Sequence, residues 1–346
     1  MGVVRRRWYG IDYLRAFMSI AVIAWHRRLF GTSSLFDAKG YLTHRVELSD
    51  IINFNLLLLA VPVFFLIAIF LQVERWSEKK LDFRCRMERL AYMYVFWTGI
   101  YVVLCRLEFP WVAIWPNTGI NFFKFLLSGG SSVFYFLFSL ILLTGVCQVS
   151  IRLPMIGQKI LAVFFLLLLW ICPVIVRQYD AWHILIAFWN PLNFVVYVFI
   201  STLVYHYIGN NPDIIHASAY RKTVIFLFIL FVLSAACEWI WFQGINNFVY
   251  DGYAFPSYTR ISVAVGATFF FLLSFSIERP PGFIIRLLSN YSLGLYCLHV
   301  FVGFYYGRLK PAINPCMNRF VDFFLILTFS LFLSILLRRA FRKGLI

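Results

Sequence analysis

Two residues that could do chemistry, Arg15 and His26, stand in the otherwise apolar segment LRAFMSIAVIAWHR. In an α-helix their spacing places them within about 20° of one face and ~16 Å apart along the axis. An ionisable group inside a membrane helix is costly unless it faces protein or water. The pair therefore predicts a polar cavity beside this helix. An arginine would lie at one end, and at the other a histidine, which is suited to proton transfer near neutral pH.

Each of these residues also has a purely structural interpretation. Arg15 could anchor the helix at the membrane surface through its long side chain. His26 could be a hydrogen-bonded histidine at the opposite interface. Their shared face favours the cavity over either alternative. Asp12, three residues before Arg15, is expected to pair with it.

The composition places these residues in a membrane protein. Of 346 residues, 62% are hydrophobic and 13% are charged, which is more apolar surface than a soluble domain can bury. We expect an all-α, polytopic membrane protein with about ten transmembrane helices, forming a single domain over residues 1–346 with no appended soluble domain. The expected spans are 13–30, 51–72, 90–106, 133–150, 160–176, 190–208, 223–243, 260–277, 290–306 and 320–337.

The distribution of charge predicts the topology. Most Lys and Arg residues fall in the segments that share a side with the N-terminus, so the positive-inside rule places both termini in the cytoplasm. This accounts for most of the net charge of +16, and no nucleic-acid partner is expected. The cysteines are scattered without a Cys-x-x-Cys pair, so neither a disulfide framework nor a metal site is expected. Residues 118–132 are expected to form a short interfacial helix closed by a Gly-Gly turn.

Five motifs, in order along the chain, resemble the acyltransferase-3 family of integral membrane acyltransferases. The first is Arg15, followed after ten residues by His26. The others are VPVFFLIAIFL at 61–71, RMERLAYMYVFW at 86–97, FYFLFSLIL at 134–142 and LSNYSLGLYCLHVFVG at 288–303. Ala68 and Ile69 stand where the family usually has Ser and Gly, and Met93 replaces a common proline.

The resemblance implies a membrane O-acyltransferase, and specifically an O-acetyltransferase of the bacterial cytoplasmic (inner) membrane. Such an enzyme moves the acyl group from cytoplasmic acetyl-CoA to a hydroxyl of a surface polysaccharide, such as the O-antigen of lipopolysaccharide, or of its lipid-linked precursor. Acetyl-CoA is then a donor substrate, and no permanently bound cofactor is expected. The expected partners are this acyl-CoA, the carbohydrate acceptor and the lipid bilayer.

The resemblance also suggests roles for particular residues. His26 could act as the general base on the acceptor hydroxyl, which we favour, or could briefly carry the acyl group. Arg15, Arg86 and Arg89 suit the phosphates of coenzyme A, because a guanidinium binds phosphate through two parallel hydrogen bonds. Arg84 is interpreted as one of the positive charges that orient the protein in the membrane, without a role in binding a ligand. The ~16 Å between Arg15 and His26 is similar to the reach of a pantetheine arm laid along the helix.

Two further groups of polar residues lie within expected spans. Ser292, Tyr296 and His299 share one face of their helix. They form either an interhelical hydrogen-bond cluster or a group that orients the acyl donor or acceptor. Glu238 lies within the span 223–243, where a carboxylate is a candidate for acceptor binding or proton relay. Tyr258 and its aromatic neighbours could stack on sugar rings or form an interfacial aromatic belt.

Two other classes of protein stay open at this point. A polysaccharide or lipid-linked sugar exporter would also be polytopic and basic, but would more often show inverted repeats or broken helices at matching places. A non-catalytic sensor or scaffold would tolerate the loss of Arg15 or His26, and both are present. Neither alternative predicts the face shared by the arginine and the histidine.

The charge pattern makes a prediction about topology. Reporters fused after Ile346 and inserted near Asp82 should both read cytoplasmic, whereas a reporter near Asp37 should read extracytoplasmic. Paired alkaline phosphatase and fluorescent-protein fusions at the three positions measure this. An extracytoplasmic signal at Ile346 would contradict the arrangement of ten spans.

Overall fold

The computed structural model describes residues 7–31, 47–77, 82–108, 119–130, 132–209, 211–243, 256–313 and 318–340. Asp37 and Ile346 lie outside these residues. The described residues form helices and no strands. The α-helices are α1 (Tyr9–His26), α2 (Leu48–Ile51), α3 (Ala60–Ser77), α4 (Phe83–Glu108), α5 (Gly119–Leu127), α6 (Tyr135–Ser150), α7 (Met155–Gln178), α8 (Val195–Val204), α9 (Ser218–Gln243), α10 (Ile261–Phe275), α11 (Phe283–Asn290), α12 (Ser292–Ile313) and α13 (Arg319–Ala340). Short 3₁₀ and π segments are η3 (Ile52–Leu56), η4 (Leu57–Leu59), η5 (Asp180–Leu185), η6 (Pro191–Phe194), η7 (Tyr205–Gly209) and η8 (Pro212–His216).

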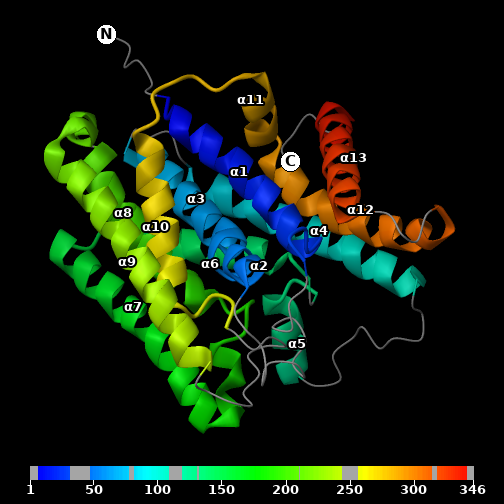
Figure 1. Cartoon of the computed structure of the whole chain (residues 1–346), viewed down its shortest axis with the longest axis horizontal. Helices are drawn as coiled ribbons and strands as arrows, with labels where there is room; N and C mark the ends of the chain where they lie inside the picture. The colour runs from blue at the N-terminus through cyan, green and yellow to red at the C-terminus, as the bar shows by residue number, and fades with distance from the viewer. Residues whose placement is uncertain are drawn as a thin grey trace.

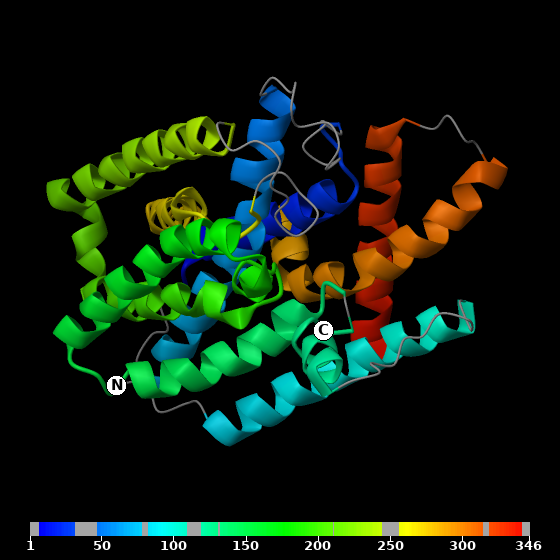
Figure 2. The same ribbon diagram turned by 90° about the horizontal axis from the view of Figure 1, so that it is seen from below.

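Helix α1 runs through the middle of the molecule and organises the rest (Figure 1). It packs against α3, α10, α11 and α12, and more weakly against α13. Helices α7 to α10 lie to one side of it and α11 to α13 to the other. Figure 2 shows α4, in cyan, along one edge of the molecule, where it packs on α6. The helix that carries Arg15 and His26 is therefore surrounded by protein.

Fewer of the described helices have the length and hydropathy typical of a membrane span than the ten spans that the sequence predicts. Each of the ten expected spans overlaps a helical segment. Among the described residues, however, only five segments are long and apolar enough, or six if the bent pair α11–α12 counts as one span. The five are Leu48–Ser77, Met155–Val176, Pro191–Gly209, Ser218–Trp241 and Arg319–Ala340. The all-helical, multi-pass class is confirmed, whereas ten crossings and the side of the termini stay predictions.

The other helices miss this criterion for identifiable reasons. Helices α6 and α10 are apolar but have only 16 and 15 residues. Helix α1 carries Asp12, Arg15 and His26 within 18 residues, and α4 begins with several charged side chains. Protein rather than lipid surrounds much of α1, which lowers the cost of its ionisable groups.

Two interruptions shape the interior of the molecule. The span that contains α3 starts as α2 and then passes through the π turn η3 and the 3₁₀ turn η4. Its polar residues Asn53 and Asn55 are buried in the π turn, a feature that often marks functional sites. The second interruption is the bend of 72° between α11 and α12. Both interruptions lie next to α1.

Glycines allow two close approaches in this fold. The expected helix near residue 120 and its glycine turn are confirmed: α5 is followed by Gly129 and Gly130 with φ of 61° and 74°. Gly10, at the start of α1, lies against α10, where a Cβ would come 1.6 Å from the carbonyl oxygen of Ser274. No side chain fits there without moving α1 away from α10.

Replacement of Gly10 should therefore destabilise the protein. We expect Gly10→Ala to lower the melting temperature in detergent by several degrees, since forced overpacking costs about 1–3 kcal/mol. The matched control is Gly145→Ala in α6, because a Cβ at Gly145 meets nothing within 4 Å and alanine is the better helix former. Equal melting temperatures for the two variants would contradict the close contact between α1 and α10.

Candidate active site

The polar face of α1 meets a polar face of α12. At one end of the contact, Nη2 of Arg15 donates a hydrogen bond to Oγ of Ser292 at 2.9 Å. At the other end, the imidazole rings of His26 and His299 lie 5.1 Å apart between centroids. Tyr296 lies between Ser292 and His299 on α12. The structure thus brings the expected cluster on α12 against the expected stripe on α1.

Asp12 and Arg15 line one cavity, but the direct hydrogen bonds of Asp12 go to other residues than the expected Arg15. Oδ2 of Asp12 accepts a hydrogen bond from Nη2 of Arg7 at 2.9 Å, and its Oδ1 accepts one from Oγ of Ser289 at 2.9 Å. Asp12 therefore ties the start of α1 to α11. Arg15 turns instead toward α12 and keeps the rest of its guanidinium for the space beside it.

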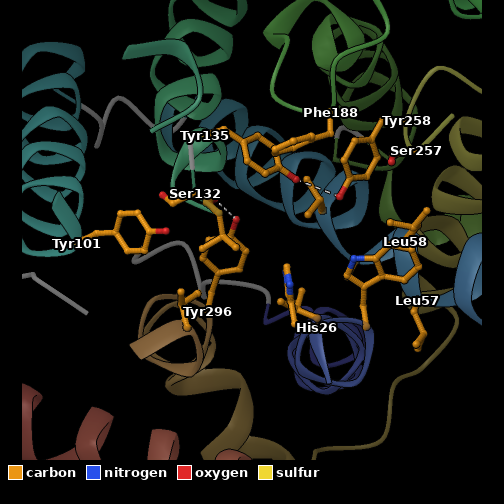
Figure 3. Close-up of a pocket in the computed structure, with 16 residues that line it drawn as sticks. His26, Leu57, Leu58, Tyr101, Ser132, Tyr135, Phe188, Ser257, Tyr258 and Tyr296 are labelled. Atoms are coloured by element: carbon orange, nitrogen blue, oxygen red, sulfur yellow. Dashed lines mark hydrogen bonds between the residues drawn. The ribbon is translucent and has the colours of Figure 1, made fainter. Parts of the chain in front are cut away.

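His26 opens into a cavity of about 330 Å³, called here the histidine cavity. Its imidazole is exposed within this space, and Figure 3 shows it pointing away from α1 toward the middle of the cavity. Oη of Tyr135 donates a hydrogen bond to Oη of Tyr258 at 3.0 Å on the opposite wall. The other aromatic residues of the lining are Trp25, Tyr101, Phe188 and Tyr296.

Two more cavities lie toward the Arg15 end of α1. The arginine cavity, of about 250 Å³, is lined by Arg15, Arg75 and Arg86 together with Ser292, Tyr296 and apolar side chains. The entrance cavity, of about 510 Å³, shares Arg15, Leu71 and Arg75 with it. The additional polar residues of the entrance cavity are Arg7, Asp12, Glu74 and Asn290.

Tyr296 separates the arginine cavity from the histidine cavity and lines both. Its hydroxyl donates a hydrogen bond to the carbonyl oxygen of Val133 at 2.5 Å. Its ring packs on Phe136 with centroids 4.9 Å apart. The three cavities therefore follow one another along α1, from an arginine-rich end to His26, with this ring at the boundary.

The structure distributes the expected phosphate-binding arginines unevenly. Arg15 and Arg86 share the arginine cavity, whereas Arg89 is exposed and lines none of the three cavities. Nη2 of Arg86 donates to the carbonyl oxygen of Ala68 at 3.3 Å. Its Nε is buried without a hydrogen-bond partner among the described residues. Because Arg86 lines this cavity, its guanidinium is placed to bind a ligand there.

Arg75 is a site residue that the sequence analysis missed, because it was counted only as topology charge. It follows Ala68 by seven residues and Leu71 by four on α3, a spacing that places all three on one helical face. All three line the arginine cavity. This periodicity was the available signal, and it could be recognised only once that face was known to border a cavity.

Glu238 lies apart from the histidine cavity in a buried polar cluster. Its Oε1 accepts a hydrogen bond from the backbone N–H of Ser262 at 2.8 Å, and Nη1 of Arg260 lies 3.6 Å from its Oε2. Arg260 also donates to the carbonyl oxygen of Phe54 in η3. Phe54 packs edge-on against Trp25, with centroids 5.4 Å apart. The cluster thus supports a wall of the histidine cavity from behind.

Asn55 and Trp239 complete this cluster. Nε1 of Trp239 donates to Oδ1 of Asn55 at 2.8 Å, and Asn55 lies within 3.5 Å of Oγ of Ser262. The sequence pointed to Glu238, but it gave no role to Asn55 or to Arg260, the first residue of the expected span 260–277. A lone asparagine in an apolar run and an arginine just before a helix carry no pairing signal of their own.

The fold and the site together define a class of protein. It is a multi-pass helical membrane protein whose interior holds a series of cavities between an arginine cluster and a histidine. Residues 8–339 match the acyltransferase-3 family, described as an acyltransferase domain, and the chain belongs to that family. The resemblance seen in the motifs is confirmed, and the protein is a membrane acyltransferase. No curated protein and no solved structure matches the chain.

The contact between Arg15 and Ser292 predicts that lysine cannot replace Arg15. Lysine keeps the charge but cannot bind Ser292 and a phosphate at the same time with a planar, forked donor set. We expect Arg15→Lys to reduce acyl transfer in membrane vesicles at least about tenfold.

The control is Arg84→Lys, an exposed residue that pairs with Glu88 on the surface of α4. It should transfer acyl groups at the wild-type rate. Near-normal transfer by Arg15→Lys would reduce Arg15 to a helix anchor.

Proposed function

We propose that the protein is a membrane O-acetyltransferase of the bacterial inner membrane. It moves the acetyl group from cytoplasmic acetyl-CoA to a hydroxyl of a surface polysaccharide, such as O-antigen, or of its lipid-linked precursor. The observation that carries the proposal is the order of the three cavities, which run from Arg15, Arg75 and Arg86 to His26. This order suits a donor with an anionic nucleotide at one end and a reactive thioester at the other.

The arginine end fits the phosphates of the donor. Guanidinium groups bind phosphate through paired hydrogen bonds and stay charged at any physiological pH. Arg15, Arg75 and Arg86 converge on one cavity, and the buried Nε of Arg86 has no hydrogen-bond partner among the described residues. In this proposal the wide entrance cavity holds the nucleotide and opens to the cytoplasm. The pantetheine arm follows α1 past Tyr296, over the ~16 Å that separate Arg15 from His26.

The histidine end fits the chemistry. His26 faces the cavity with an exposed imidazole, and a neutral imidazole accepts a proton from an attacking hydroxyl. The acceptor oxygen forms a bond to the acetyl carbon as the bond from that carbon to the thioester sulfur breaks. The proton passes from the hydroxyl to His26 and then to the departing sulfur of coenzyme A. Every step is accounted for without a further reactant.

The walls of the histidine cavity fit a carbohydrate acceptor. Tyr101, Tyr135, Phe188 and Tyr258 provide ring faces and hydroxyl groups around the space in front of His26 (Figure 3). Rings of this kind cover the apolar face of a sugar while hydroxyls bond its rim. In this proposal the acceptor enters the cavity from the side of the membrane opposite to the donor.

The proposal predicts that His26→Ala abolishes acetyl transfer and spares donor binding. The substitution removes the proton acceptor, which is worth about 10²–10⁴ in rate, and leaves the arginine cavity intact. We would measure transfer from labelled acetyl-CoA, supplied to one face of sealed vesicles at a time, and equilibrium binding of acetyl-CoA. Retained transfer in His26→Ala, or lost donor binding, would contradict these roles.

The double variant Arg75→Ala with Arg86→Ala should have the opposite effect. Both residues line the arginine cavity and neither lines the histidine cavity. The KM for acetyl-CoA should rise at least about tenfold while the rate at saturating donor changes little. Mass spectrometry of surface glycans, with and without the gene, identifies the acceptor and tests the proposal in cells. An unchanged donor KM in the double variant would move the phosphate site elsewhere.

A further inference from the structure

His299 is a second histidine beside the proposed base, and its surroundings are unusual. It lies on α12 with 2% of its surface exposed. Its ring lies 5.1 Å from that of His26 between centroids, with the ring planes at 40°. Unlike His26, it is not part of the lining of the histidine cavity. His299 therefore contacts the proposed base from behind and does not face the acceptor.

The protonation state of His299 follows from its hydrogen bond. Nδ1 lies 3.1 Å from the carbonyl oxygen of Leu295, one turn earlier on α12. A carbonyl oxygen only accepts hydrogen bonds, so Nδ1 must carry a hydrogen. In a neutral ring Nε2 is then a bare acceptor. It is buried and has no hydrogen-bond partner among the described residues, an arrangement that costs free energy unless a donor reaches it.

Three neighbouring residues could donate a hydrogen bond to Nε2 of His299. Tyr296 lies 6.0 Å away between ring centroids, but its hydroxyl hydrogen is already committed to the carbonyl oxygen of Val133. Arg27 directly follows α1, and its Nη1 donates to the carbonyl oxygen of Gly303, one turn beyond His299. His26 is the nearer of the two ring neighbours, 5.1 Å from His299 between centroids, and its imidazole has an N–H to offer.

We propose that His299 is a positioning residue that fixes the tautomer of His26. The bare Nε2 of His299, which has no direct partner among the described residues, accepts a hydrogen bond from one ring N–H of His26 through a bridging water, or directly once the two rings turn toward each other. The other ring nitrogen of His26 is then unprotonated and available to a hydroxyl in the histidine cavity. The inference rests on the base role of His26 in the proposed function and adds the group that sets its orientation.

This arrangement has a chemical consequence. When His26 takes the proton of the acceptor hydroxyl, both of its nitrogens carry hydrogen and the ring becomes positively charged. The hydrogen bond to His299 then strengthens, because a charged donor binds a neutral acceptor more tightly. The proton returns to the thiolate of coenzyme A, and His26 recovers its starting tautomer. An imidazole performs this supporting role without a buried negative charge, which would be costly in an apolar interior.

A pair of substitutions distinguishes positioning from packing. His299→Phe fills the same space but removes the acceptor, whereas His299→Gln can place its amide oxygen near the position of Nε2. We expect His299→Phe to lower kcat at least about tenfold, with the KM for acetyl-CoA unchanged. His299→Gln should recover most of the rate. The matched control is His206→Phe in η7, where the histidine contacts Gln158 away from the three cavities.

A spectroscopic measurement tests the same point without turnover. In protein with isotope-labelled histidine, nitrogen chemical shifts should show His299 protonated at Nδ1 and His26 in a single tautomer. His299→Phe should convert His26 to a mixture of tautomers, whereas His206→Phe should not. If acetyl-CoA supports no transfer by the wild-type protein, the proposed function fails, yet this spectrum still decides the role of His299.

Three results would overturn the inference. The first is an equal loss of rate in His299→Phe and His299→Gln, which would indicate packing alone. The second is a changed donor KM at unchanged kcat, which would place His299 in the donor site. The third is a single, unaltered His26 tautomer in His299→Phe. Melting temperatures of the two variants, measured in detergent, identify any loss that comes from unfolding.

Discussion

The structure depends on the cost of placing Arg15 and His26 in an apolar helix. Either group facing lipid would cost several kcal/mol, so α1 must lie in the interior with its polar face toward a matching one. Helix α12 supplies that face through Ser292 and His299. The remaining space between the two helices and their neighbours forms the three cavities. The central position of α1 and the bend between α11 and α12 both allow the two polar faces to meet.

The sequence predicts those parts of the arrangement that follow from the spacing of residues along a single helix. The spacing of Arg15 and His26 fixes their common face, and the same periodicity groups Ser292, Tyr296 and His299. Residue patterns could not show that the two faces meet, since that contact depends on how distant helices pack. Asp12 illustrates the limit: its nearest arginine on the helix is Arg15, but its partners are Arg7 and Ser289.

The polar residues that were hardest to predict are those that support a cavity wall without lining the cavity themselves. Arg260 lines no part of the histidine cavity, yet it donates to the backbone of Phe54, whose ring packs on Trp25 beside His26. The number of membrane crossings stays a prediction for a related physical reason. Helices α6 and α10 are short and α1 carries ionisable groups. Hydropathy alone cannot distinguish a helix that meets lipid from one enclosed by other helices.

The pairing of α1 with α12 also has a consequence for biogenesis. The hydrogen bond from Arg15 to Ser292 and that from Ser289 to Asp12 each join residues 277 positions apart. The ribosome delivers α1 to the bilayer long before its partners exist, and during that interval Arg15 must keep its charge in the interfacial water. Folding of the enzyme therefore includes a late step, in which α11 and α12 pack against α1 and bury its polar face. Contacts this distant in sequence close slowly.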